Sequence, residues 1–411
     1  MNSANKQALT TKLGALRKTL QIDRLMRADG AIVDTAFASA LNFLSAFVIG
    51  VLYGVSTLGE FSLILIYSSF VYLFAYNFII VPATSKPWSI SDYRFAQKVM
   101  VISLFSFVPL ACSILAFDHI VLNFSNQSMF LSFVYIVSHN AFLTLRRVVL
   151  HLGLAKYPTL IPLVVLVAVS IPAAIGVVSY TAFLLTYSLS FFVAIAHTVF
   201  RRPERTLLPD IALAVDFLRF SRWMTFGIWF QWLSGNLVQL LVQHHSGAEA
   251  LGTLRVLLSS FGFLSIYFQY QEIVLARAHR GETNPRFTLS SALDLESYVL
   301  PSMLILLCLP IYLVYCHMVG TTPLWTAAII YSVYQFLVFA SIIMRVYLRL
   351  MGDLQFAMFG YIGMVITVVS VELMNAHALD LMNATIMYLA SMSVMVMVLA
   401  VGLLKTAKRR A

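Results

Sequence analysis

Residues 31–61 read AIVDTAFASALNFLSAFVIGVLYGVSTLGEF, which is a mostly apolar run at 31–53 followed by a turn, GVSTLGEF, at 54–61. A bilayer core about 30 Å thick is crossed by about 20 apolar residues in a helix. Inside that core every backbone amide needs an internal hydrogen-bond partner, and a continuous apolar run meets this need as a helix. A strand of a membrane barrel would instead alternate apolar and polar residues over about ten positions. The stretch therefore predicts a transmembrane helix that ends in a short turn.

The same pattern recurs along the whole chain. Of the 411 residues, 60% are hydrophobic and 11% are charged, and the mean hydropathy is +0.87. A soluble domain has about 25% charged residues, so this composition excludes an ordinary soluble enzyme. Apolar runs occupy residues 31–53, 61–83, 99–117, 129–145, 157–178, 182–200, 224–242, 251–275, 298–315, 324–344, 354–371 and 381–404. We predict an all-α polytopic membrane protein with about twelve transmembrane helices.

Positively charged residues orient these predicted helices. Of the 27 Lys and Arg residues, 26 fall in segment 1–30, in alternate loops or in the basic tail 405–411, and Arg255 is the exception. Cytoplasmic loops are enriched in Lys and Arg, so both termini are predicted to be cytoplasmic. The net charge of +10 then reflects topology, and no nucleic-acid partner is expected. Segment 1–30 is predicted to be a basic amphipathic helix on the anionic inner leaflet, with a solvated basic tail as the alternative.

The chain contains an internal repeat. The turn at 54–61 has a counterpart, GAEALGTL, at 247–254, so that G-x-x-x-L-G-x-apolar recurs 193 residues later. Pro109 and Pro310 lie near the centres of the third and ninth runs, and Arg146 and Arg345 each precede a glycine by seven residues. Repeats with an even number of spans share one orientation across the membrane. We predict two pseudo-symmetric six-helix lobes, an N-lobe (31–200) and a C-lobe (224–404), joined by a cytoplasmic linker (201–223).

The beginning of the chain resembles the oligosaccharide flippases of the MOP (multidrug/oligosaccharidyl-lipid/polysaccharide) superfamily. The resemblance lies in the asparagine of the first span, Asn42, in the motif LGEF at 58–61 and in the aromatic- and serine-rich second span. The arginine-rich turn at 145–153 is also similar. The family commonly has glycine where Ser62 stands, which is a departure from the motif.

The resemblance implies that the two lobes surround a central cavity that opens alternately to each side of the membrane. Within the superfamily, the length and the span number suit the Wzx-type flippases of O-antigen and related polysaccharide units. Their substrate is an undecaprenyl-pyrophosphate-linked oligosaccharide, carried from the inner to the outer leaflet of the bacterial inner membrane. The implied partners are this lipid-linked oligosaccharide, the lipid bilayer and other membrane proteins of polysaccharide assembly.

Polar residues at helical spacing predict which spans face the cavity. Polar side chains in a span usually face protein or water, and those of the seventh span form one narrow stripe at i, i+4, i+7 and i+11. Stripes in the first, second and eighth spans complete the predicted substrate cavity, whose members are Asn42, Tyr72, Tyr76, Trp232, Asn236, Gln239, Gln243, Arg255, Ser265, Gln269 and Glu272. The alternative is that the same amides and hydroxyls join helix to helix.

Three arginines are candidates for contact with a phosphate. Arg255 could pair with the pyrophosphate through its planar guanidinium, or it could snorkel to the outer headgroups. Arg219 and Arg222 flank the start of the seventh span and could steer the phosphate from the inner leaflet. As cytoplasmic anchors of the span they would need no such role.

Three further titratable residues lie in or near the spans. Glu272 is predicted to be an interfacial carboxylate near Arg277, with a coupling-ion or proton site as the alternative. Asp34 is predicted to lie at the level of the headgroups rather than to relay protons. His139, which lies deeper, is predicted to be a histidine hydrogen-bonded to a helix rather than one that titrates.

No sequence motif indicates a chemical active site. The outward loops are short, no glycine-rich phosphate loop or HExxH motif occurs, and the three cysteines have no metal-binding spacing, so neither enzyme activity nor a cofactor is expected. A cation-coupled multidrug exporter is one alternative, and it would require a deeply buried carboxylate in the N-lobe. A membrane-embedded glycan polymerase or transferase is the other, and the short outward loops argue against it.

Overall fold

The computed structural model describes residues 30–85, 92–122, 129–152, 154, 157–199, 210–221, 225–278, 292, 294–353, 355–374 and 379–410. These residues form helices and turns, with no β-strand among them, so the predicted all-α fold is confirmed. The predicted basic segment 1–30 lies almost wholly outside the described residues. Arg222 and the side chain of Gln269 also lie outside them.

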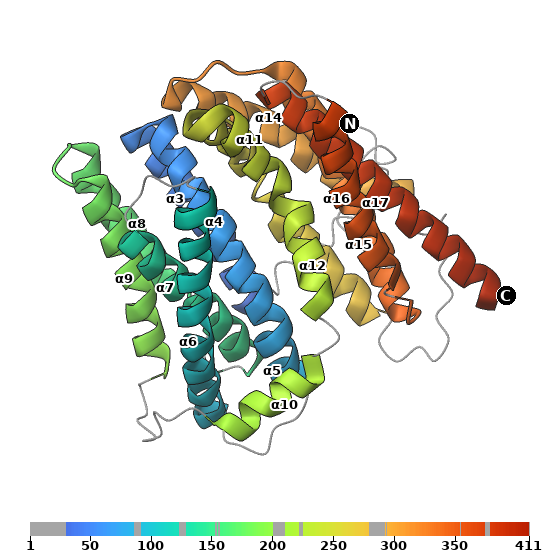
Figure 1. Ribbon diagram of the computed structural model, residues 1–411, viewed down its shortest axis with the longest axis horizontal. Helices are drawn as coiled ribbons and strands as arrows, with labels where there is room; N and C mark the ends of the chain where they lie inside the picture. Colours follow the sequence, from blue (N-terminus) through green and yellow to red (C-terminus); the bar gives the residue numbers. More distant parts are fainter. Residues whose placement is uncertain are drawn as a thin grey trace, which may run out of the picture.

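The helices fall into two groups with a short helix between them. The first group comprises α3 (Gly30–Tyr53), α4 (Val55–Ala75), α5 (Val81–Ser85), α6 (Asp92–Phe117), α7 (Met129–His151), α8 (Leu160–Ala174) and α9 (Tyr180–Val199). The second comprises α11 (Thr225–Ser260), α12 (Leu264–Ala278), α14 (Val299–Val319), α15 (Trp325–Leu350), α16 (Gln355–Met374) and α17 (Leu381–Arg410). Figure 1 shows the two groups side by side, with α3, α4 and α11 where they meet.

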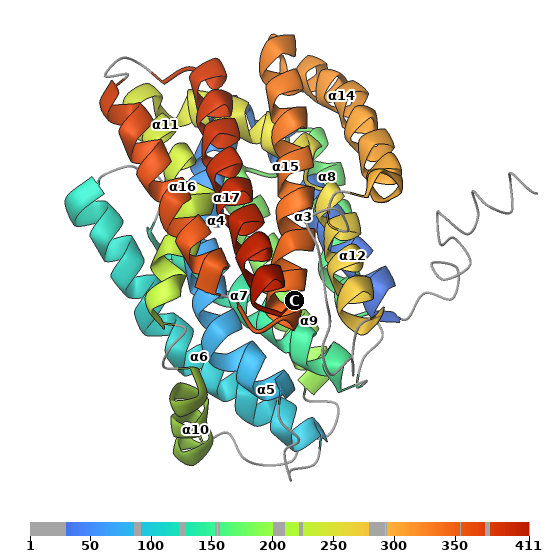
Figure 2. The same ribbon diagram turned by 90° about the vertical axis from the view of Figure 1, so that its right-hand side faces the viewer.

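A short amphipathic helix lies in the predicted linker. This helix, α10 (Ile211–Ser221), packs beside α5 at one end of the first group (Figure 2). It buries Leu213 and Phe217 and exposes Ile211 and Leu218. The linker therefore includes an ordered helix that contacts the first lobe.

Two helices depart from a straight span. Inside α11, Gly247 has φ 78° and ψ −173°, so the helix is interrupted there and its two parts belong to the seventh and eighth predicted spans. A second interruption, at 261–263, separates α11 from α12, and the Gly262 N–H donates to the Ser259 carbonyl at 2.9 Å. The eighth span, predicted as one continuous helix, is thus broken near its middle. Irregular backbone at this depth is tolerated where protein or a polar cavity surrounds it.

Nine helices of the described chain are long and apolar enough to cross a membrane by length and composition. The other predicted spans correspond to α8, which has 15 residues, and to the two parts of α11 with α12. The first part of α11 carries amides and histidines that lower its hydropathy, and these include the polar stripe predicted to face the cavity. The chain is therefore a multi-pass membrane protein whose least apolar spans lie at the meeting of the two lobes.

The repeated turn has the same conformation in both copies. Gly54 has φ 89° and ψ 168°, close to the values at Gly247, and both lie in a region that glycine alone adopts freely. A Cβ on Gly59 would lie 1.8 Å from the carbonyl oxygen of Ala248, and a Cβ on Gly252 would lie 2.0 Å from that of Val55. Ala248 corresponds to Val55 in the repeat, so the two contacts are reciprocal. We call this pair of contacts the glycine clasp, and the end of the molecule that carries it, predicted to face outward, the outward end.

Further contacts join the lobes below the clasp. The Trp232 Nε1–H of α11 donates to the Ile66 carbonyl and to the Ser69 hydroxyl of α4, both at 3.1 Å. The Tyr315 hydroxyl of α14 donates to the Ala46 carbonyl of α3 at 2.7 Å. These contacts hold the two lobes together, and Ile66 and Ser69 also line the cavity described next.

Candidate substrate cavity between the lobes

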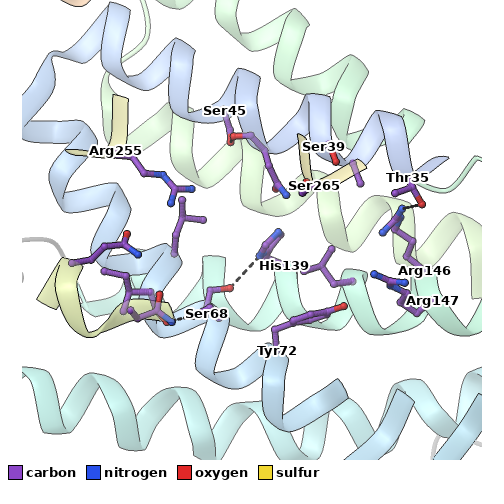
Figure 3. A pocket seen from close by; sticks show the side chains of 18 residues that line it. Thr35, Ser39, Ser45, Ser68, Tyr72, His139, Arg146, Arg147, Arg255 and Ser265 are labelled. Atoms are coloured by element: carbon purple, nitrogen blue, oxygen red, sulfur yellow. Dashed lines mark hydrogen bonds between the residues drawn. The ribbon is translucent and has the colours of Figure 1, made fainter. Parts of the chain in front are cut away.

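A cavity of about 330 Å³ lies between the two lobes (Figure 3). Three helices of the first lobe and two of the second contribute its walls. Most of the lining residues are polar: Thr35, Ser39, Asn42 and Ser45 from α3; Ser68, Ser69 and Tyr72 from α4; His139, Arg146 and Arg147 from α7; Asn236, Gln239 and Arg255 from α11; and Ser265 from α12. The cavity therefore presents many hydrogen-bonding groups in the interior of a membrane protein.

Guanidinium groups lie at both ends of this cavity. Figure 3 shows Arg146 and Arg147 at one end and Arg255 at the other, with His139 between them. No carboxylate occurs among the described residues that line the cavity. The lining therefore carries positive charge that attracts anions.

Arg146 is held in place by a buried carboxylate. Asp34 is 0% exposed; it accepts a hydrogen bond from the Arg146 Nε–H and another from the Thr159 backbone N–H at 2.9 Å. Another guanidinium nitrogen of Arg146 donates to the Thr35 hydroxyl at 3.2 Å. Asp34 lies at the start of its span, near Val33, and is enclosed by protein and paired with Arg146, a cation predicted to lie in a loop.

Arg147 and Arg255 have donors left over for a ligand. The Nε atoms of both are buried and have no hydrogen-bond partner among the described residues. Arg255 lies near the hydroxyls of Tyr135 and Tyr315, and its side chain points into the cavity (Figure 3). This orientation differs from snorkelling to the outer headgroups. Since buried polar groups in proteins are nearly always paired, these donors are suited to oxygen atoms of a substrate.

A polar cluster lies at the middle of the cavity. The Ser68 hydroxyl accepts a hydrogen bond from the Asn140 side-chain amide at 2.9 Å and lies 3.1 Å from His139 Nδ1. The ring of His139 also packs against Tyr135 and Phe191. His139 is thus hydrogen-bonded to a neighbouring helix, α4, in agreement with the prediction of a helix-bonded histidine.

Six of the eleven predicted cavity residues line it. They are Asn42, Tyr72, Asn236, Gln239, Arg255 and Ser265, and they come from four different helices. The side chain of Gln269, a seventh member of the predicted set, lies outside the described part. The polar stripes thus predicted four of the helices that line the cavity, and α7 was not among them.

The other four predicted residues do not line it. Trp232 is buried against α4 by the two hydrogen bonds given above, so it joins the lobes, as the alternative interpretation of the stripe proposed. Gln243 is buried elsewhere in the protein, and Tyr76 is 37% exposed in the π-helical turn η1 (Tyr76–Ile80). Glu272 accepts a hydrogen bond from Arg349 at 3.1 Å, and both side chains are nearly half exposed.

Of the three candidate steering residues, Arg255 lines the cavity and Arg219 does not. Arg219 is exposed on α10, and Arg222 lies outside the described residues. The Lys98 ammonium donates to Asp210 at 2.7 Å and ties the start of α10 to α6. This hydrogen bond holds the pKa of Asp210 below its ordinary value. The linker helix is therefore anchored to the first lobe by an ion pair.

Arg146 and Arg147 were missed as cavity residues. The apolar run ends at Leu145, so both arginines were assigned to a cytoplasmic loop, whereas α7 continues to His151. Arg146 follows His139 by seven residues, which places them on one helical face. This seven-residue spacing was the feature of the sequence that could have placed Arg146 beside the cavity.

No family model matches the chain, and no curated protein matches it significantly. Solved structures share its fold. An inward-facing multidrug resistance MATE family transporter of the MOP superfamily is 14% identical with a TM-score of 0.60, over 92% of this chain and 94% of that chain. The lipid II flippase MurJ, in an inward closed conformation, is 13% identical with a TM-score of 0.61, over 92% and 90%. A eukaryotic MATE transporter is 13% identical with a TM-score of 0.57, over 96% and 100%.

These matches extend over nine tenths or more of both chains in each comparison. At such low identity they show the arrangement of helices and leave the substrate open. The chain therefore has the fold of the MATE and MurJ transporters.

Proposed function

We propose that this protein is a flippase that moves an undecaprenyl-pyrophosphate-linked oligosaccharide from the inner to the outer leaflet of a bacterial inner membrane. The protein acts as a transporter, without a chemical reaction of its own. The observation that carries the proposal is the cavity between the lobes, which three arginines line without a carboxylate among its described lining residues.

The charge of the cavity fits a pyrophosphate. Arginine presents several donors in a plane and pairs two phosphate oxygens at once. Arg147 and Arg255 each have a buried Nε donor without a partner among the described residues, whereas part of the Arg146 charge is neutralised by Asp34. An anionic group that enters the cavity is thus favoured by both electrostatics and hydrogen bonding.

The amphipathic substrate also explains why a cavity between lobes is needed. A sugar headgroup cannot cross hydrocarbon unassisted, because its hydroxyls would lose their hydrogen bonds to water. The polyprenyl chain remains in the bilayer while the headgroup passes through the polar cavity. Hydroxyls and amides on α3, α4 and α11 supply replacement hydrogen bonds along that path.

Alternating access requires two arrangements of the lobes. In the structure the glycine clasp brings backbone against backbone at the outward end. Opening the clasp while the opposite ends of the lobes approach would expose the cavity to the other side. The relative tilt of two lobes is the kind of bistable element that such transporters use.

A cation-coupled multidrug exporter is the second candidate, because MATE transporters share the fold. An exporter of cationic drugs is expected to have a carboxylate at the binding site to attract them. Asp34, a buried carboxylate that contacts the lining residue Arg146, is already paired with that arginine. The charge of the described lining therefore favours an anionic substrate over a cationic one.

Deletion of the gene tests the proposal in cells. The expected result is accumulation of a complete lipid-linked glycan in the inner leaflet, because synthesis continues while transfer stops. Expression of the wild-type chain should restore outward delivery, and an Arg147→Gln variant should restore it poorly. Normal outward delivery in the deletion strain, with no redundant flippase, would rule the proposal out.

A further inference from the structure

A second cavity, of about 370 Å³, adjoins the first on the side of the second lobe. The two cavities share Ser69, Tyr72 and Asn236, so one wall belongs to both. The remaining lining comes from α11, α15, α16 and α17, apart from one residue of α4. We call this space the C-lobe chamber.

The walls of the C-lobe chamber differ in chemistry from those of the first cavity. Its lining includes Tyr334, Tyr361, Met364, Met392 and Met395. Methionine is flexible and polarizable, so it adapts to ligands of irregular shape. Such walls suit a ligand with flat C–H faces.

The lining of the chamber also includes polar groups. Gln231, Ser234, Ser341 and Asn236 contribute amides and hydroxyls to it. The Ser234 and Ser341 hydroxyls donate to carbonyls of their own helices, so each retains acceptor capacity for a hydroxyl group of a ligand. The combination of apolar side chains with hydroxyl and amide groups matches a pyranose ring, which has C–H faces and a perimeter of hydroxyls.

One cation lies in the C-lobe chamber. Arg345, which the sequence repeat pairs with Arg146, donates to the Tyr361 hydroxyl at 2.7 Å and to the Ser341 carbonyl at 3.3 Å. The first cavity is lined by three arginines and the chamber by this one. The two spaces therefore differ in charge, and the stronger positive charge lies in the first cavity.

We propose that the C-lobe chamber binds the sugar residues of the cargo while the arginines of the first cavity bind its pyrophosphate. The inference rests on the proposed function and specifies where the two parts of the headgroup lie. The first sugar is bonded directly to the pyrophosphate, so their binding sites must adjoin, as these two cavities do. Tyr72 and Asn236 lie at the junction and contact both parts of the cargo.

A substitution at Gly235 can fill the C-lobe chamber without filling the first cavity. It lines the C-lobe chamber and not the first cavity, and a Cβ built on it meets no atom within 4 Å. Gly235→Phe therefore places a ring in the chamber without a clash at the backbone. Gly227→Phe is the matched control, because Gly227 lies on the same helix, has equally open surroundings and lines neither cavity.

Binding to the purified full-length protein in detergent is measured with two probes. One is undecaprenyl pyrophosphate without sugar, and the other is the lipid-linked glycan extracted from the deletion strain. We expect Gly235→Phe to weaken binding of the glycan-bearing lipid at least tenfold and to leave binding of undecaprenyl pyrophosphate within about twofold. Gly227→Phe should match the wild type with both probes.

Equal effects of Gly235→Phe on both probes, or no effect on either, would overturn the assignment of the chamber to the sugars. If the wild type binds neither probe, the proposed function itself fails. Gln231→Leu is a second, smaller change in the lining of the chamber and should weaken only the glycan-bearing lipid, by several fold. A thermal unfolding midpoint for each variant separates loss of binding from loss of fold.

Discussion

At the scale of single residues, guanidinium groups give the cavity its preference for anionic ligands. Arg146 is oriented by Asp34 and Thr35, while Arg147 and Arg255 retain buried donors without a partner among the described residues. Arg146 therefore has a structural partner to keep, whereas Arg147, which also bonds Tyr72, and Arg255 each have a buried Nε donor available to a ligand. This difference leads to separate predictions for binding and for stability.

The first prediction concerns Arg255→Gln. Hydrogen bonds to a charged partner contribute about 1.5–3 kcal/mol, so loss of this guanidinium should weaken binding of undecaprenyl pyrophosphate about 10- to 100-fold. Arg349→Gln is the matched control, because Arg349 pairs with Glu272 where both are nearly half exposed. It should change the affinity less than twofold in the same binding assay. Equal affinities for the Arg255→Gln variant and the wild type would remove Arg255 from the proposed phosphate site.

The second prediction concerns Asp34→Asn. Removing one partner of a buried ion pair leaves an uncompensated charge and typically costs about 3–5 kcal/mol. Asp34 is fully buried and Arg146 nearly so, so we expect a clearly lower thermal unfolding midpoint for the purified variant. The double variant Asp34→Asn/Arg146→Gln should be less destabilised than the sum of the two single variants. Additive effects would show that the two side chains do not interact.

The glycine clasp is the main feature at the scale of elements. Two helix starts, after Gly54 and after Gly247, cross so closely that each glycine of the L-G pair lies against the backbone of the other copy. The clasp therefore ties α4 to α11 without any charged group. Its strength depends on the absence of side chains at Gly59 and Gly252.

The third prediction follows from this close approach. Gly59→Val would place a side chain where the Ala248 carbonyl lies, so the outward ends of the lobes could not close. We expect a cysteine placed at Asn42, which lines the cavity, to react faster with a membrane-impermeant maleimide added from the outward side. Gly227→Val, in open surroundings on α11, should leave the rate unchanged. An unchanged rate in Gly59→Val would show that the clasp does not close the outward side.

The spans and the internal repeat could be predicted from the sequence. Membrane spans must be long and apolar, and the two turns share one glycine-containing pattern. The matching φ and ψ values at Gly54 and Gly247 agree with that repeat. The break at 261–263 was not predicted, because the apolar content of a sequence does not show where helical hydrogen bonds are lost. The end of α7 was misplaced because the helix continues beyond its apolar run, and Arg146 was therefore assigned to a loop.

The site was harder to predict than the spans. Helical periodicity shows which residues share a face, but it does not show which neighbour covers that face. Asn236 and Gln239 line the cavity, whereas Trp232, on the same stripe, is covered by α4. Asp34 could not be paired with Arg146 from sequence, because the two are 112 residues apart and no local pattern joins them.

At the scale of the whole molecule, two lobes with the fold of MATE and MurJ transporters enclose two adjoining cavities of different chemistry. Contacts at the outward end hold the lobes together, and the arginine-lined cavity lies below those contacts. The central claim is that this cavity is a route for a polar headgroup across the membrane. Such a route must be reached by water from each side in turn.

Labelling of a single cysteine at Asn42 tests this claim most directly. The native residues Cys112, Cys308 and Cys316 are first replaced, and membrane-impermeant maleimide is then added to one side of the membrane at a time. The account predicts labelling from the cytoplasmic side at rest and from both sides while the cargo is being made. Failure to label from either side, in a variant that folds and restores glycan delivery, would contradict it.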